Sequence, residues 1–220
     1  MKGIYWLIVI FVLAIPFAYY YIAPKEKQLP IINPVDVNDS LVDTELLRKG
    51  FGHTIGDFKF LNQNGKSLSS MDIDGKIWVA EYFFTTCGSI CPKMNQQMKR
   101  VQSAFSGDDN LVILSFTVTP EIDSVEQMKK HADFLGAELP QWQLLTGDKK
   151  ELYNLARKSF FLLKPAETEN MGDAGNDFIH TNNFVLVDQE RRIRGYYDGT
   201  NAKEVNKMMN DIERLKKTKN

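Results

Sequence analysis

Residues 77–105, "IWVAEYFFTTCGSICPKMNQQMKRVQSAF", decide the fold class of this chain. The stretch opens with a mostly apolar run, Ile77–Phe84, which has the character of a strand buried on both faces of a sheet. It continues into Pro92–Phe105, where apolar side chains recur at helical spacing. A buried strand that leads directly into an amphipathic helix is typical of an α/β sheet with parallel strands.

The remaining chain continues this alternation of strands and helices. Leu111–Val118 is a second apolar run with the character of a buried strand. Two further helices are predicted to begin at Ser124 and Asp148, because Gln or Glu follows three residues later, as in a capping box. A hairpin at Asn64–Gly65 precedes them, and two strands joined through Gln189–Glu190 and an amphipathic helix close the chain. The prediction is an α/β fold with a mixed sheet flanked by helices.

Composition argues against one class of partner. The chain has 220 residues with 27 Lys and Arg against 28 Asp and Glu, which gives a net charge of -1. Its basic residues are scattered and form no stripe, so nothing attracts nucleic acid. The hydrophobic fraction of 43% is enough for one domain with a substantial core.

The first segment predicts attachment to a membrane. Ile4–Ala23 is uncharged and, at ~1.5 Å per residue, is long enough to cross ~30 Å of hydrocarbon, with aromatic residues near both ends. The apolar run exceeds the ~7–15 residues of a signal-peptide core, and no clean cleavage site follows it. No transit peptide precedes it, so we expect a single-pass anchor, residues 1–24, in a bacterial inner membrane.

The anchor predicts the organisation of the rest. Residues 25–50 are polar, contain several prolines and lack a sustained period, which indicates a linker between the membrane and the domain. Residues 51–220 then form the folded domain. Because a long trailing domain translocates despite a weak charge bias, we expect it on the extracytoplasmic (periplasmic) side.

The chain has two cysteines, Cys87 and Cys91. Cys87 falls at the predicted end of a buried strand and Cys91 in the first turn of the next helix, where α/β sheets bind ligands. The helix N-terminus is expected to favour a thiolate over a thiol. The spacing lets both sulfurs share one metal ion or one disulfide bond. A structural disulfide and two inert buried thiols remain alternatives, although so short a loop would stabilise little as a staple.

The same residues resemble a known family. "FFTTCGSICPKM" followed by "DFIHTNNFVLVDQERRIRGYYDGT" is similar to the SCO/SenC family, membrane-anchored copper proteins that serve cytochrome c oxidase assembly. The similarity runs from about His53 to the C-terminus and includes "TVTPEIDS". The resemblance implies a thioredoxin-like fold, and it implies that Cys87, Cys91 and His180 are copper ligands.

The chemistry of this ligand set agrees with the resemblance. Two thiolates and an imidazole suit Cu(I) and tolerate Cu(II), whereas structural zinc would need a fourth protein ligand. The chain departs from the common family pattern at Gly88 and Ser89, between the cysteines, and at Thr119, where an aspartate is frequent. These departures spare the ligands but alter the local electrostatics, and with them partner and redox preferences.

Other candidate ligands carry weaker signals. His131 lies beside lysines in a predicted helix, the pattern of a solvated face, and His53 at the start of the domain is expected to be structural, with a secondary metal role left open. Met171 lies in an acidic, glycine-containing loop before His180 and is an alternative soft donor, although such a Met is more often an ordinary loop residue.

Two functions follow from these residues. The first is copper delivery to the copper-site subunit of cytochrome c oxidase, which is not enzymatic in the strict sense. The second is thiol-disulfide exchange through Cys87 and Cys91 with an oxidase subunit or another envelope partner, including other thiol-disulfide or copper-carrier proteins. A peroxidase of the peroxiredoxin type is excluded, because Phe84 and Gly88 occupy the positions where such enzymes need proline and threonine before Cys91.

Overall fold

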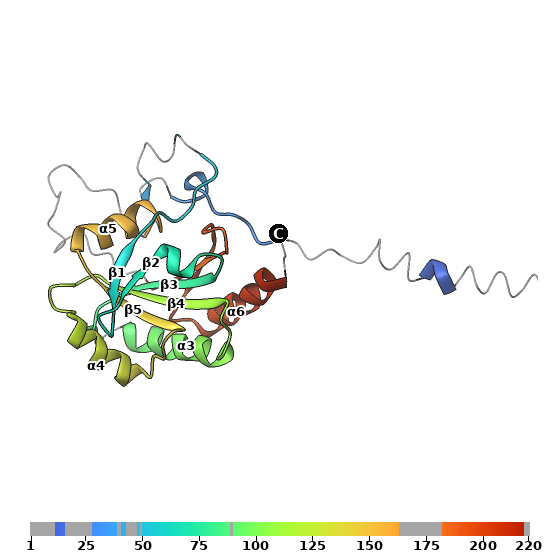
Figure 1. The fold of residues 1–220 in the computed structure, drawn as a ribbon. Helices are drawn as coiled ribbons and strands as arrows, with labels where there is room; N and C mark the ends of the chain where they lie inside the picture. Colours follow the sequence, from blue (N-terminus) through green and yellow to red (C-terminus); the bar gives the residue numbers. More distant parts are fainter. Residues whose placement is uncertain are drawn as a thin grey trace, which may run out of the picture.

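A seven-stranded mixed sheet forms the centre of the protein (Figure 1). The computed structural model describes residues 12–15, 28–38, 41–42, 48, 50–88, 90–162 and 182–217. The sheet has the order β2-β1-β5-β4-β3-β6-β7. Its strands are β1 (Lys59–Asn62), β2 (Ser67–Ser69), β3 (Ile77–Phe83), β4 (Leu111–Thr117), β5 (Trp142–Thr146), β6 (Asn183–Val187) and β7 (Ile193–Asp198).

The three central strands run parallel, and the outer ones complete the sheet in antiparallel pairs. In the register of β3 and β4, Ile77 lies opposite Leu111 and Phe83 opposite Thr117. The two strands therefore end side by side. All seven residues of each strand are buried, which is what their continuous apolar runs predict.

Helices cover both faces of this sheet (Figure 1). The helices are α3 (Cys91–Ala104), α4 (Val125–Leu135), α5 (Lys149–Lys158) and α6 (Ala202–Lys217). Helices α3, α4 and α6 lie on one face, and α5 lies on the other. The predicted caps are present, since the Ser124 hydroxyl accepts from Gln127 N at 3.3 Å and the Asp148 carboxylate from Glu151 N at 2.9 Å. The prediction of a mixed sheet flanked by helices is confirmed.

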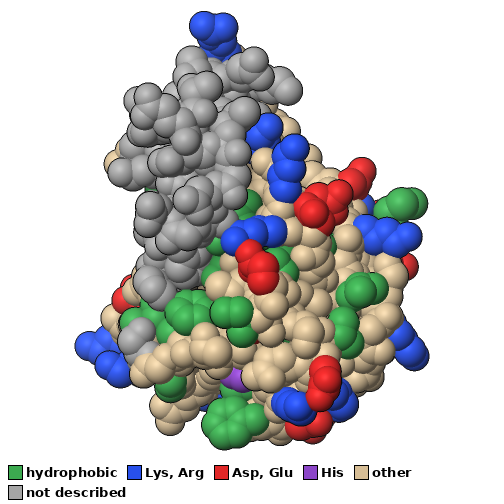
Figure 2. Space-filling view, turned by 90° about the vertical axis from the view of Figure 1, so that its left-hand side faces the viewer, with side chains coloured by type: hydrophobic (Ala, Val, Ile, Leu, Met, Phe, Trp, Pro, Cys, Tyr) green, Lys and Arg blue, Asp and Glu red, His purple; other side chains and the backbone are tan. Residues whose placement is uncertain are grey.

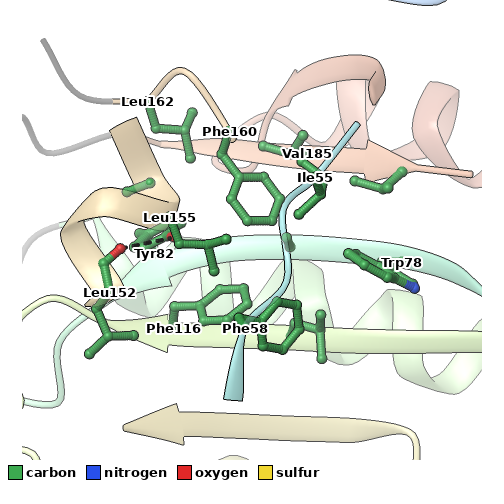
Figure 3. Close-up of a cluster of buried hydrophobic side chains, with 14 of the residues drawn as sticks. Ile55, Phe58, Trp78, Tyr82, Phe116, Leu152, Leu155, Phe160, Leu162 and Val185 are labelled. Atoms are coloured by element: carbon green, nitrogen blue, oxygen red, sulfur yellow. Dashed lines mark hydrogen bonds between the residues drawn. The ribbon is translucent and has the colours of Figure 1, made fainter. Parts of the chain in front are cut away.

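Alternation along β3 divides its side chains between two hydrophobic cores. On the α5 face, Tyr82 stacks on Phe116 with ring centroids 5.2 Å apart, and its hydroxyl donates to Leu152 O at 3.5 Å (Figure 3). Figure 3 labels members of this core: Ile55, Phe58, Trp78, Tyr82, Phe116, Leu152, Leu155, Phe160, Leu162 and Val185. The core on the other face includes Ile77, Val79, Phe83, Cys91, Met94, Met98, Val101, Met128, Trp142 and Met208.

Part of the segment expected to be a linker is in contact with the domain. The buried Arg194 on β7 donates to Leu29 O at 2.5 Å and to Pro30 O at 2.9 Å. Ile32 N donates to Ile193 O at 2.8 Å. Residues 29–32 therefore lie along the outer strand of the sheet.

The predicted membrane helix falls largely outside the described residues. Of Ile4–Ala23 the structure describes only residues 12–15, which are helical. Within the described part of the chain, no helix is both long enough and apolar enough to span a bilayer.

Candidate metal centre

Cys87 lies in the turn that leaves the carboxyl end of β3. Its backbone N–H donates to Phe84 O at 3.2 Å, which closes the turn. The side chain of Asp123 binds the same turn, because Thr85 Oγ1 donates to Asp123 Oδ1 at 2.5 Å. Cys87 as a whole is only partly buried.

Cys91 is the first residue of α3 and belongs to the core. It is 5% exposed and packs in the same core as Met94 and Met98, which follow it on the buried side of the helix. Pro92 occupies the first turn, where its missing N–H costs no helical hydrogen bond. The site thus pairs a partly buried cysteine with a buried one.

Neither thiol is joined in a disulfide, and the two side chains are close neighbours. Burial raises the pKa of the Cys91 thiol far above its ordinary value, and the neighbouring Cys87 raises it further, against a hydrogen bond from the Phe84 backbone that lowers it. The expectation of a thiolate at the helix N-terminus is therefore wrong for Cys91, because burial outweighs the helix. Metal binding or disulfide formation must remove this proton.

Glu81 contributes an unexpected carboxyl group to the buried side of this site. It alternates with Val79 and Phe83 along β3, so its side chain points to the face that α3 covers. Its Oε1 accepts from the Ser115 hydroxyl at 2.6 Å, while its buried Oε2 has no partner in the described structure. Burial raises the pKa of Glu81 to about 7, and its charge in turn raises the pKa of Cys91.

The predicted third ligand is not described. His180 lies outside the described residues, as does Met171. Among the residues that the structure describes, no three His, Cys, Asp or Glu side chains form a group able to hold a metal ion. The structure thus brings Cys87 and Cys91 together and leaves the placement of His180 untested.

The other two histidines are both held by the fold. His53 Nε2 bonds to Ser159 O at 2.8 Å and its ring lies 4.4 Å from that of Phe161, which agrees with a structural role. His131 does not lie on a solvated face as predicted. Its ring stacks on Phe83 at 5.5 Å, and Nε2 is buried without a partner in the described structure. Burial lowers the pKa of both imidazoles.

The spacing of apolar residues in the sequence could have shown that His131 is partly buried. His131 lies three residues after Met128 and four before Leu135, both of which are buried, so it borders the apolar side of α4. Glu81 gave a weaker signal, as the one charged residue in a buried strand. Asp123 lies in the stretch "TVTPEIDS" that carries the resemblance, but its contact with Thr85 gave no signal, because the two residues are 38 positions apart in the chain.

The surface near α4 and α5 carries mixed charges. Figure 2 shows the left-hand side of Figure 1, where blue and red side chains are interspersed with hydrophobic ones. Two hydrophobic side chains in α4 and the loop before it are well exposed, Ile122 at 56% and Phe134 at 79%. No basic stripe is visible among the described residues of this face.

Comparison with known proteins gives a consistent family. The sequence model of the SCO1/SenC family matches residues 48–217. A SCO1 protein homolog of Bacillus subtilis is 29% identical over 170 residues, covering 76% of this chain and 85% of the relative. A Stutzerimonas stutzeri protein named as copper-binding is 25% identical over 164 residues, covering 74% of this chain and 78% of its own length.

Solved structures agree with the sequence match. A SCO1/SenC family lipoprotein of Bacillus anthracis superposes with a TM-score of 0.65 at 28% identity, over 77% of this chain and 99% of that protein. BsSco, described as a Sco-family cytochrome c oxidase assembly protein with a disulfide switch, superposes with a TM-score of 0.63 at 29% identity. That match covers 77% of this chain and 96% of BsSco.

Proposed function

The chain belongs to the SCO1/SenC family, and from that premise we propose that it binds one copper ion through Cys87, Cys91 and His180. In this proposal it delivers copper to the dinuclear copper site of a cytochrome c oxidase subunit. The observation that carries the proposal is a pair of neighbouring cysteines, not joined in a disulfide, between the end of β3 and the first turn of α3. The copper-binding relative and the oxidase-assembly role of BsSco support the same conclusion.

The donor set fits copper as cargo. Two neighbouring cysteines four positions apart can share one ion, and thiolates select Cu(I). Burial of Cys91 keeps water from one side of the site, while the partial exposure of Cys87 leaves a route for exchange with a partner. An imidazole from His180 would complete a three-coordinate site and would tolerate Cu(II).

Thiol-disulfide exchange is the second candidate function, and the same cysteines would perform it. Joining the sulfurs in a disulfide removes the donors that copper needs, so oxidation and metal binding exclude each other. The disulfide switch named for BsSco supports this reading. Reduction of cysteines in an oxidase subunit and copper delivery to that subunit can therefore be sequential steps of one protein.

Membrane attachment belongs to the proposal as well. We propose that residues 1–24 anchor the chain in a bacterial inner membrane, that 25–50 link it, and that 51–220 form a periplasmic copper domain. The uncharged run Ile4–Ala23 supports the anchor. The related Bacillus anthracis protein is described as a lipoprotein, which supports a membrane-associated site of action.

The substitution His180→Ala separates the two functions. If copper delivery is the function, this variant should lose oxidase activity in cells grown in low-copper medium, since one of three donors is missing. Its disulfide should still form and break, because neither sulfur is changed. The matched control is His53→Gln, which changes an imidazole that is bonded to Ser159 O. The control should retain copper affinity.

Three measurements decide between the candidates: oxidase activity in cells, and the copper affinity and disulfide potential of the purified full chain. Lost activity with an unchanged potential supports copper delivery and contradicts a purely redox function. Normal oxidase activity of His180→Ala in low-copper medium contradicts copper delivery.

A further inference from the structure

Asp123 is a fully buried carboxylate at the loop between β4 and α4. Its exposed fraction is 0%, and it directly precedes the helix cap Ser124. Its backbone is fixed on both sides, since its N–H donates to Thr119 O at 2.9 Å and its carbonyl accepts from Thr146 Oγ1 at 2.8 Å. The carboxylate therefore has a defined position beneath the ends of the central strands.

Three threonines converge on this carboxylate. Thr119 Oγ1 donates to Asp123 Oδ2 at 3.0 Å, and Thr117 Oγ1 donates to the same oxygen. Thr85 Oγ1 donates to Oδ1 at 2.5 Å, and the Thr85 N–H lies 3.3 Å from Oδ1 and 3.4 Å from Oδ2. All of these donors are uncharged.

The three donors come from two different strand ends. Thr117 is the last residue of β4, and Thr119 follows it in the loop. Thr85 lies two residues beyond the end of β3 and two before Cys87. Asp123 thus connects the turn that carries Cys87 to the neighbouring strand, which the parallel register of β3 and β4 holds fixed.

Stability alone does not explain a charge at this place. A buried carboxylate without a cation costs several kcal/mol of desolvation, which hydrogen bonds from hydroxyl groups offset only in part. Among the described residues, Asp123 makes no ion pair with Lys or Arg, and it interacts with the imidazole of His131, whose pKa burial lowers. An apolar side chain would avoid the desolvation cost but could not accept a hydrogen bond from the turn that carries Cys87. The Asp123 carboxylate accepts such a bond from Thr85.

We propose that Asp123 is a positioning residue for the cysteine site, and that through Thr85 it holds Cys87 at the distance from Cys91 that disulfide formation and metal binding require. The inference rests on the proposed function, because it assigns a role within the same site. Cys91 is fixed independently by its burial in α3, and only residues 88–90 separate the two cysteines. The position of Cys87 therefore depends on how its turn is held from the Thr85 side.

The expected effect follows from effective concentration. Releasing the turn lets Cys87 move away from Cys91, which lowers the effective concentration of one thiol at the other. Oxidation joins the two sulfurs, and the two protons and two electrons released reduce one glutathione disulfide to two glutathione molecules. A tenfold loss of effective concentration reduces the equilibrium constant of this exchange tenfold, equivalent to a potential about 30 mV less negative.

The test compares two threonines that bind the same carboxylate. Thr85→Val removes the hydroxyl on the cysteine turn, whereas Thr119→Val removes a hydroxyl on the other side of Asp123. Both variants keep the side-chain shape, and each leaves Asp123 with one donor fewer. Thr85→Ser restores the hydroxyl and serves as the conservative rescue.

Three quantities are measured on the full chain: the free energy of unfolding in urea, the copper-free disulfide potential in glutathione buffers, and Cu(I) affinity against a competing chelator. Both valine variants should lose similar stability. Only Thr85→Val should show an equilibrium constant for disulfide formation that is about tenfold smaller, which makes the disulfide potential less negative. Only this variant should also bind Cu(I) about tenfold more weakly. Thr85→Ser should match the wild type in both.

Equal potentials and equal Cu(I) affinities in Thr85→Val and Thr119→Val would overturn the proposal, since Asp123 would then act on stability only. The copper-free potential keeps this result separate from the proposed function. If the wild type bound no copper while Thr85→Val still shifted the potential, the copper-carrier function would fail and the positioning role would stand.

Discussion

Glu81 shows how a single residue imposes a pH dependence on the protein. The folded state keeps its carboxyl protonated up to a pKa of about 7, because burial disfavours the charged form. The unfolded chain releases the same proton near pH 4.5. Between these values the folded state binds more protons than the unfolded state, so the free energy of unfolding falls as pH rises through this window.

Glu81→Gln should remove this dependence. The amide is similar in size and uncharged, so the variant gains stability relative to the wild type as pH rises from 5 to 8, by up to about 3 kcal/mol. Urea unfolding of the reduced, copper-free proteins at both values measures the gain. The control is Glu126→Gln, an exposed glutamate paired with Lys130, for which we expect little change. Parallel pH profiles for wild type and Glu81→Gln would show that Glu81 is ionised in the folded protein.

At this scale the sequence predicts the sulfur donors better than their surroundings. Cys87 and Cys91 were identifiable because strand end and helix start are both local patterns. Asp123 was not, because its partner Thr85 reaches it only through the pairing of β3 with β4. The burial of Cys91 likewise arises only when the sheet and helices pack together. It raises the pKa of the thiol, whereas the helix N-terminus alone predicts a lowered pKa.

At the scale of elements, the start of α4 fixes where the loop that contains Asp123 ends. The helix begins at the Ser124 cap and ends at Gly136, whose φ of 68° is left-handed. An added Cβ at Gly136 would meet nothing within 4 Å, so any cost of a larger residue comes from the backbone alone. Both ends of this helix were predictable, because capping residues act within a few positions of the chain.

Gly136→Ala should lower the free energy of unfolding by about 1–2 kcal/mol, because alanine is strained in the left-handed region. Gly88→Ala is the matched control. It also adds a Cβ that meets nothing within 4 Å, but Gly88 does not have a positive φ. We expect its stability to stay within about 0.5 kcal/mol of the wild type. Equal losses in the two variants, measured by urea unfolding, would show that the left-handed backbone is not the cause.

At the scale of the whole molecule, the sequence predicts the layers but not the complete strand order. Periodicity identified the strands and helices, and the parallel βαβ connections followed from their alternation. The placement of β1 beside β5 had no such signal, because the pairing of Leu61 with Thr146 joins segments far apart in the chain. The contact of residues 29–32 with β7 was missed for the same reason, since these residues meet Ile193 and Arg194 only across a large separation in the chain.

Removal of residues 1–24 tests the organisation of the whole chain. The full chain should fractionate with bacterial membranes and should be degraded by protease added to spheroplasts, because the uncharged run Ile4–Ala23 is long enough to span them. The shortened chain, expressed behind an added, cleavable export signal, should be released in soluble form from the periplasm. Protection of the full-length domain from protease would contradict the proposed orientation, and release of the full chain without detergent would contradict the anchor.

The central claim, a copper site built on the two thiols, is tested most directly by anaerobic Cu(I) titration of the reduced full chain against a competing chelator. The wild type should bind one Cu(I) per chain. Cys87→Ser and Cys91→Ser should each weaken binding by more than about 100-fold, because loss of a ligand should exceed the 10–100-fold effects of outer-shell changes. Both variants should remain folded, since the pair closes no large loop. Unchanged Cu(I) affinity in either variant would contradict the site.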